Sequence, residues 1–298
     1  MKTTQALEEY LIDHQIKGHS WHTLKHYKSN ITAFSIFTEN IDIENIEHSH
    51  LKEYYIYLIG QALSSVTVQT YFRAIRAFLT WCYNEGYIKT NLSEKFRLPK
   101  AKRHVIDVLT DNEISQLIKC FNIKTFYGIR DICIVFLMLD SGLRVNEVAT
   151  LKHGDVHIVE GYLKVLGKGN KERYAPLGLN TKKHLLKYLH HIPCPQYSDT
   201  LFVDDQITPL KLSAYNQLFK RLKKRSKIPR LRAHLLRHTF ATRYIEAGGD
   251  IYSLQSILGH TTLEMVKKYV HLTPSKITDR YAKFSPLDNL MQKSRKPV

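Results

Sequence analysis

The sequence has 298 residues, enough for two domains, and its 43% hydrophobic and 24% charged residues exclude a disordered chain or a fibrous repeat. Its 44 lysines and arginines outnumber the 27 aspartates and glutamates, which gives a formal net charge of +17. The apolar runs are too short to cross a bilayer, no signal peptide opens the chain, and the four cysteines are scattered, so we expect a cytoplasmic protein with reduced thiols.

The first hundred residues are predicted to form a small bundle of four helices. Apolar residues recur at spacings of three and four over residues 4–14, 21–37, 51–58 and 66–83. Ser20 and Ser65 stand before two of these segments as N-caps, and Gly86 is placed to end the last helix. This part of the chain is nearly neutral, since residues 1–100 hold 11 basic and 10 acidic side chains.

The segment that begins at Arg97 carries several charges, one proline and no apolar periodicity, which predicts an extended linker. We therefore place a helical domain at residues 1–96, the linker at 97–107 and a second domain at 108–298. From residue 101 onward the chain holds 33 basic and 17 acidic side chains, a net charge of +16. A basic part beside a nearly neutral one indicates nucleic acid as the partner.

The second domain is predicted to mix helices with a small antiparallel sheet. Thr110 and Glu113 form a capping box that opens its first helix. Three short segments of alternating character, separated by glycine turns, predict antiparallel strands at 156–159, 162–166 and 173–176. Helices are expected at about 111–121, 125–140, 179–191, 211–226, 234–247, 250–257 and 262–271.

Four short motifs in the basic domain hold polar side chains that helix propensity and packing do not explain: SGLRVNEV at 141–148, GKGNKER at 167–173, HLLRHTF at 234–240 and LGHTT at 258–262. Arg144 falls in the first turn of a helix, where a positive charge is unfavourable unless it faces an anion. His234 and Arg237 share a helix face, and the arginine favours the neutral imidazole that a general base requires. Each motif alone also has an ordinary structural explanation, such as a surface arginine or a hydrogen-bonded histidine.

Together, and in this order, the motifs match the tyrosine recombinase (phage integrase) family residue by residue, and the sequence resembles its compact Xer-like members over nearly the whole chain. The resemblance implies a mainly helical fold with a small antiparallel sheet. It implies an N-terminal four-helix, SAM-like core-binding domain and a C-terminal α+β catalytic domain, which form a C-shaped clamp on DNA. It also implies six catalytic residues: Arg144, Lys168, His234, Arg237, His260 and Tyr269.

The resemblance assigns the nucleophile to Tyr269, whose phenol would attack a DNA phosphodiester and leave a 3′-phosphotyrosyl bond with a free 5′-hydroxyl. Planar guanidinium groups suit the charge that spreads over the non-bridging oxygens, so Arg144 and Arg237 resemble a clamp for that charge. Tyr281 is a rival nucleophile, but no Gly-His element precedes it as one precedes Tyr269.

The resemblance also implies which residues transfer protons and which support the site. Lys168, on a glycine-flanked hairpin, would protonate the leaving 5′-oxygen, and His234 would accept the phenolic proton as general base. His260 would hydrogen-bond the scissile phosphate, and Glu147 would orient neighbouring side chains of the site.

No cofactor and no metal ion are expected, because the sequence has no P-loop pattern and no acidic cluster suited to phosphoryl chemistry. The implied partners are double-stranded DNA with inverted-repeat core sites and, in a synaptic complex, further copies of the chain in a homotetramer or a related recombinase, with no membrane involved. The resemblance suggests that an apolar stripe at 287–291 docks on a neighbouring copy, although packing on its own domain is the ordinary alternative for such a stripe. The resemblance favours a site-specific recombinase acting in integration, excision, transposition or dimer resolution. A type IB topoisomerase and a non-catalytic DNA-binding accessory protein are the alternatives.

Overall fold

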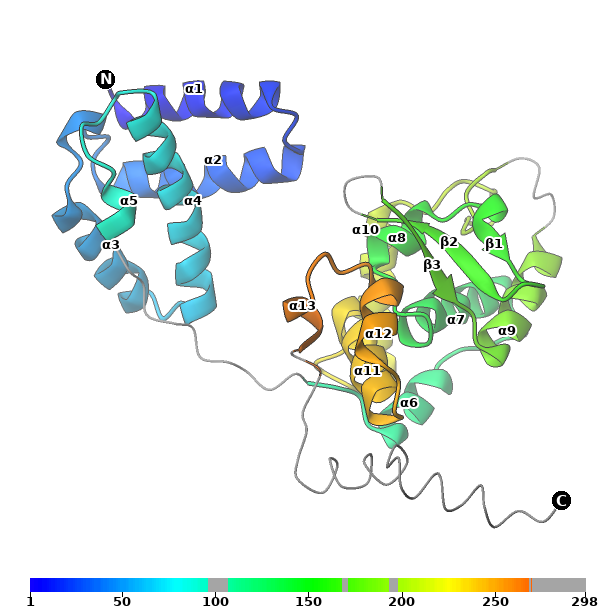
Figure 1. Cartoon of the computed structure of the whole chain (residues 1–298). Helices are drawn as coiled ribbons and strands as arrows, with labels where there is room; N and C mark the ends of the chain where they lie inside the picture. The colour runs from blue at the N-terminus through cyan, green and yellow to red at the C-terminus, as the bar shows by residue number, and fades with distance from the viewer. Residues whose placement is uncertain (96–106, 168–170, 193–197, 268, 270–298) are drawn as a thin grey trace, which may run out of the picture. The chain divides into compact units, whose positions relative to one another are not determined.

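The chain divides into two compact units, Met1–His104 and Val105–Val298 (Figure 1). The computed structural model describes residues 1–95, 107–167, 171–192, 198–267 and 269. The predicted linker therefore lies, apart from residue 107, outside the described residues, as does the apolar stripe at 287–291. Among the residues that are described, no helix is long and apolar enough to span a membrane.

The first unit consists of helices joined by short turns, and the four predicted helices are all present. Its elements are α1 (Thr3–Ile16), α2 (Trp21–Phe37), the 3-10 turn η1 (Ile43–Asn45), α3 (His48–Gly60), α4 (Ser65–Asn84) and α5 (Leu92–Lys95). Helix α4 is capped by Ser64 rather than by the predicted Ser65, because the Thr67 N–H donates to the Ser64 hydroxyl at 3.1 Å. Ser65 is instead the first helical residue.

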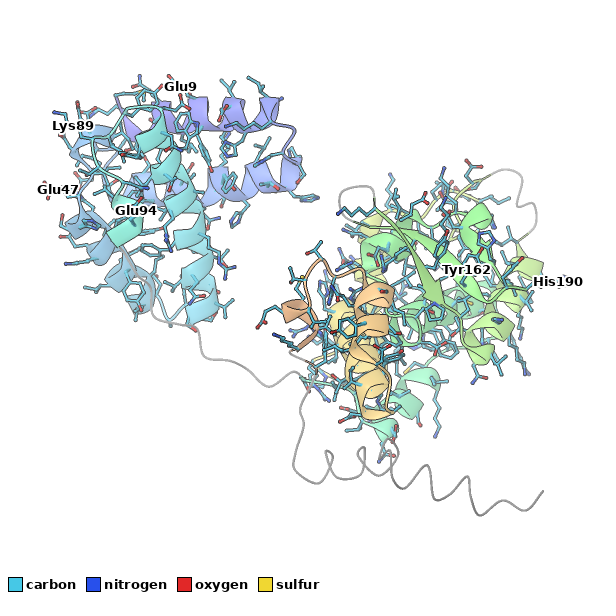
Figure 2. The ribbon with its side chains drawn as sticks, in the orientation of Figure 1. Glu9, Glu47, Lys89, Glu94, Tyr162 and His190 are labelled. Carbon is cyan, nitrogen blue, oxygen red and sulfur yellow. The ribbon has the colours of Figure 1, made fainter. Side chains whose placement is uncertain are left out.

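The core of this unit is built around α4, whose Phe72 and Phe78 are fully buried. Tyr10 of α1 meets Phe78 edge to face, with ring centroids 5.5 Å apart, an arrangement that aromatic rings favour. Charged side chains such as Glu9 and Lys89 lie exposed on the outside (Figure 2). The apolar faces of these amphipathic helices therefore point into the core, as the spacing of their apolar residues predicts.

The second unit combines helices with one small sheet. Its elements are α6 (Asp111–Ile118), α7 (Phe126–Leu139), α8 (Val145–Thr150), the 3-10 turn η2 (His153–Asp155), β1 (Val156–His157), β2 (Tyr162–Leu166), β3 (Glu172–Pro176), α9 (Leu179–His191), α10 (Leu212–Arg225), α11 (Ala233–Glu246), α12 (Ile251–Leu258) and α13 (Glu264–Lys267). The strands pair antiparallel in the order β1-β2-β3, with Val165 opposite Arg173. The predicted fold class, mainly helical with one small antiparallel sheet, is confirmed.

Helix α7 forms the centre of the second core, because its residues 132–138 are apolar on every side and are buried. Helices α9 and α11 pack on α7, and α12 packs on both α11 and β3 (Figure 1). Leu163 and Val165 of β2 point inward and close this core. The packing brings the start of α8, strand β3, helix α11 and the C-terminal end of α12 together, and these segments carry the four motifs.

Candidate active site

The loop between α7 and α8 presents Arg144. The chain turns at Gly142, which has a φ of +67° and no room for a side chain, since a Cβ there would lie 2.5 Å from Cδ1 of Phe240. The turn delivers Arg144 to the N-cap of α8, one position before the helical turn in which the sequence placed it. The backbone N–H of Arg144 donates to Oε2 of Glu147 at 2.7 Å, and its Nη1 donates to Oε1 at 2.8 Å.

Glu147 lies at the centre of the site, with only 6% of its surface exposed. Arg173 of β3 binds both carboxylate oxygens, with Nη1 and Nη2 donating at 2.9 and 2.8 Å, and Nη1 of Arg237 lies 3.8 Å from Oε2. Burial alone would raise the pKa of Glu147, but the hydrogen bonds and charge of Arg173, together with the bonds from Arg144, hold it below its usual value. These contacts fit the orienting role predicted for Glu147.

Arg237, on α11, is buried and donates in three directions. Its Nη1 donates to the carbonyl of Gly142 at 2.6 Å, its Nη2 donates to the carbonyl of Leu258 at 2.7 Å, and Nη2 lies 3.1 Å from Nε2 of His260. Because a guanidinium only donates, Nε2 accepts, which places the proton of a neutral His260 ring on Nδ1. Burial, with the charge of Arg144, lowers the pKa of Arg237 to about 9, so an added anion would stabilise its protonated form.

The last turn of α12 forms one wall of the site. The carbonyl of Leu258 also accepts from Nη1 of Arg144 at 3.4 Å, and the carbonyl of Ile257 accepts from Nε of Arg173 at 2.7 Å. The negative end of the helix dipole thus faces three arginines and offsets part of their charge. Gly259 follows in the left-handed conformation, with a φ of +62°, and ends the helix within one residue of the expected range 250–257.

Tyr269 is 2% exposed, and its hydroxyl lies 2.8 Å from Nδ1 of His238 on α11. Burial raises the pKa of Tyr269, whereas the charges of Arg237 and Arg144 lower it, so the phenol lies within electrostatic range of the arginines. His234, the predicted general base, is exposed in the first turn of α11. His238, one helical turn further along α11, is thus a hydrogen-bonding neighbour of the phenol.

Lys168 and the rival nucleophile Tyr281 lie outside the described residues. The hairpin that carries Lys168 is described up to Gly167, whose N–H donates to the carbonyl of Lys171 at 2.8 Å. The described part of this hairpin borders an open cavity of about 1160 Å³. The polar side chains that line this cavity include those of Arg144, Lys171, Arg173, Gln255, His260 and Thr261. Basic walls of this kind suit a phosphate-bearing ligand.

Arg173 and His238 were not among the predicted site residues, although both stand inside the quoted motifs. Arg173 alternates along β3 with exposed residues and so faces inward together with Ala175. A charged residue at an inward strand position was the available signal. His238 lies one helical turn after His234, so the two share a face of α11. The sequence alone gives no reason to prefer either histidine as the partner of the phenol.

The described ranges hold no group of three or more histidine, cysteine, aspartate or glutamate side chains arranged to bind a metal ion. His190 and His191 end α9 and are exposed, and His190 lies at the periphery of the second unit (Figure 2).

Sequence profiles of two families match the chain: the phage integrase family over residues 107–276 and the phage integrase SAM-like domain over residues 4–98. Tyrosine recombinase XerD of Staphylococcus saprophyticus is 31% identical over 290 residues, which cover 94% of this chain and 98% of the relative. Tyrosine recombinase XerC of Thermodesulfovibrio yellowstonii is 31% identical, with 91% and 92% covered. The solved structure of the Tn1549 transposon integrase in complex with circular intermediate DNA is 19% identical, covers 94% of this chain and 98% of its own, and has a TM-score of 0.78, which shows the same fold.

The integrase profile covers more than half of the chain, and the XerD relative is more than 30% identical over nearly its whole length. These relatives favour neither a topoisomerase nor a non-catalytic accessory protein. The chain therefore belongs to the phage integrase family and is a tyrosine recombinase, an enzyme that cleaves and rejoins DNA at specific sites.

Proposed function

We propose that Tyr269 attacks a phosphodiester of duplex DNA held against Arg144, Arg237 and His260, forming a 3′-phosphotyrosyl bond and releasing the 5′-oxygen. The observation that carries this proposal is the group of three guanidiniums around one buried carboxylate, that of Glu147, within electrostatic range of the buried phenol. Three positive charges against one negative charge leave an excess of positive charge, which the negative charge of a phosphodiester would reduce.

The clamp has a fixed part and an accessible part. Arg237 is held by two backbone carbonyls, whereas the side chain of Arg144 is 32% exposed and lines the cavity. Donors that are positioned in advance stabilise the charge that develops on the non-bridging oxygens, and each contributes about 100- to 1000-fold to the rate. His260 would add a bond from Nδ1–H, since its Nε2 accepts from Arg237.

Two protons must move during cleavage. Lys168 would give a proton to the leaving 5′-oxygen, and His234 would take the phenolic proton from Tyr269. The 2.8 Å contact between Nδ1 of His238 and the phenol makes His238 a second candidate for this base. Attack of a 5′-hydroxyl on the phosphotyrosyl bond would reverse both transfers and rejoin the strand, so the bond energy is conserved.

A nicked suicide duplex tests this function, because loss of the short fragment beyond the nick traps the covalent adduct. We expect the wild-type protein to form the adduct, and Tyr269→Phe to bind the duplex with unchanged affinity but form none. Tyr281→Phe is the control and should form the adduct. Adduct formation by Tyr269→Phe, with loss in Tyr281→Phe, would show that the nucleophile is assigned wrongly.

We also propose that residues 1–96 and 108–298 are the two DNA-binding parts of the protein, joined by the linker at 97–107 into a clamp. The substrate would be a pair of inverted-repeat core sites, each DNA duplex binding two copies of the chain in a synaptic tetramer. The basic charge of the second part supports this proposal. A cytoplasmic setting fits the free thiols of Cys82, Cys120 and Cys133.

Two assays check this recombinase chemistry by its products. A trapped adduct excludes a protein that only binds DNA. Strand exchange between two duplexes that both carry the site excludes a topoisomerase, which rejoins the strand that it has cut. Integration, excision, transposition and dimer resolution would be distinguished by sequencing the DNA that the protein binds in cells.

A further inference from the structure

Arg173 has no part in the steps proposed above, yet it is only 9% exposed. All three nitrogens of its guanidinium are engaged inside the protein: Nε donates to the carbonyl of Ile257 at 2.7 Å, and Nη1 and Nη2 donate to Glu147 at 2.9 and 2.8 Å. A guanidinium held in this way differs from that of Arg144, which is one-third exposed and can turn toward a ligand.

We infer that Arg173 is a positioning residue, which fixes Glu147 and the last turn of α12 so that Arg144 and Arg237 face the DNA phosphate. The inference rests on the function proposed above and names the side chain that keeps the arginine clamp aligned.

The first reason is the demand of the buried carboxylate. Each oxygen of Glu147 accepts one bond from Arg173 and one from Arg144, either from its backbone N–H or from its Nη1. A buried carboxylate that loses half of its donors draws the remaining cations toward itself, because an unpaired buried charge is costly. Without Arg173, therefore, Arg144 and Arg237 would turn from the phosphate toward Glu147.

The second reason is the connection between the hairpin and α12. Gly259 passes so close to Arg173 that a Cβ at residue 259 would lie 2.8 Å from Cδ and 3.1 Å from Nε of the arginine. The carbonyl of Ile257 accepts from the same Nε, and the next carbonyl, of Leu258, accepts from Arg237. Arg173 thus fixes the helix end on which the clamp rests. It belongs to the same hairpin as Lys168, the proposed acid.

A lysine cannot replace these contacts. The guanidinium forms two parallel bonds to Glu147 with its outer nitrogens while the third nitrogen binds a carbonyl behind it. An ammonium is a single point of charge and cannot span both partners, although it keeps the charge that Glu147 requires. Lysine at 173 should therefore restore part of the function that an apolar side chain loses.

Arg130 of α7 offers a matched control. It is also a buried arginine that binds a carboxylate and a backbone carbonyl: Nε and Nη2 donate to Asp131 at 3.0 and 2.7 Å, and Nη1 donates to Val203 at 3.2 Å. Its own cavity has no lining residue in common with the cavity of the arginine clamp. Substituting Arg130 should lower stability by a similar mechanism without disturbing the clamp.

The test compares R173M and R173K with R130M and R130K in the full chain. Thermal unfolding and the single-turnover rate of adduct formation on the nicked suicide duplex are measured for each, at a temperature where all are folded. Affinity is measured with the same substitutions in a Tyr269→Phe protein, which binds the duplex without forming the adduct. We expect the rate to fall about 100-fold in R173M and about 10-fold in R173K, by analogy with the roughly 10- to 100-fold losses caused by substituting the side chains that orient metal ligands. Affinity should change by less than about threefold, because phosphate contacts along the whole site supply most of it. R130M and R130K should form the adduct at the wild-type rate.

A double substitution separates positioning from a general loss of structure. If Arg173 acts through the clamp, R173M should slow an R144A protein far less than it slows the wild type. Rates in the Arg173 variants equal to those in the Arg130 variants, or an undiminished effect of R173M in R144A, would overturn the inference. If R173M does not fold, the comparison of R173K with R130K decides the question. A wild-type protein without a Tyr269 adduct would instead refute the proposed function itself.

Discussion

Replacing Glu147 with glutamine is the sharpest test of the buried arginine cluster, because it removes the negative charge and keeps the size of the side chain. Each carboxylate oxygen of Glu147 accepts two hydrogen bonds, one from Arg144 and one from Arg173. A glutamine has one acceptor oxygen and one NH2 group. Whichever way the amide is oriented, its NH2 group takes the place of one carboxylate oxygen and faces two N–H donors of the arginines. The positive charges of the arginines also lose the negative charge that balanced them.

The expected loss of stability is large for a single substitution. Breaking a buried ion pair by removing one partner costs about 3–5 kcal/mol. In a unit of this size 1 kcal/mol changes the unfolding temperature by about 2–4 °C, so we expect Glu147→Gln to lower it by about 6–20 °C. Differential scanning calorimetry of the full chain measures this. Glu172→Gln is the control, because Glu172 pairs with Lys164 on the exposed side of the hairpin and such pairs contribute little.

The pH dependence gives a second measurement with a defined sign. The pKa of Glu147 is lowered in the folded protein and is about 4.3 in the unfolded chain. Its ionised form therefore stabilises the fold fully above that value, and the contribution is lost as the pH falls through the lower folded pKa. The difference between wild type and Glu147→Gln should be greatest at neutral pH and narrow below about pH 4. A difference that is small at pH 7, or constant down to pH 3, would refute the account of the cluster.

Four further predictions concern the chemistry and the assembly. Lys168→Ala should be rescued by a 5′-phosphorothiolate substrate, whose leaving group needs no proton, and Arg144→Ala should not; equal rescue in cleavage assays would show that Lys168 acts on phosphate charge. Gly259→Ala should lower the unfolding temperature and the cleavage rate, since a left-handed non-glycine residue costs about 1–2 kcal/mol and the new Cβ would contact Arg173. DNA affinity should fall steeply with salt in binding titrations, because the basic unit releases many counterions; a flat response would contradict this. Deletion of residues 285–298 should leave binding to one site intact and reduce recombination, as gel shifts and strand-exchange assays can determine; normal recombination would argue against docking between copies.

The sequence by itself determined the elements and the order of the motifs, because these depend on residues close together in the chain. Thr110 and Glu113 form the predicted capping box, and Gly259 ends α12 with a positive φ. The three predicted strands pair antiparallel, as expected. Each of these signals acts over a few residues, so local chemistry is sufficient to produce it. The cap of α4 moved by one position, to Ser64, since two adjacent serines offer the same local signal.

Only the tertiary structure decided which side chains share the site. Glu147 meets Arg173 from 26 positions away, and His238 meets Tyr269 from 31 positions away. No pattern along the chain singles out His238, because it lies on the same face of α11 as His234. Its contact with the phenol is a product of the tertiary fold. In the same way, Arg144 and Glu147 form an ordinary surface pair near a turn until β3 packs on α12 and removes the glutamate from water. Burial then makes the carboxylate strongly attractive to every nearby cation, and this long-range packing turns separate motifs into one cluster.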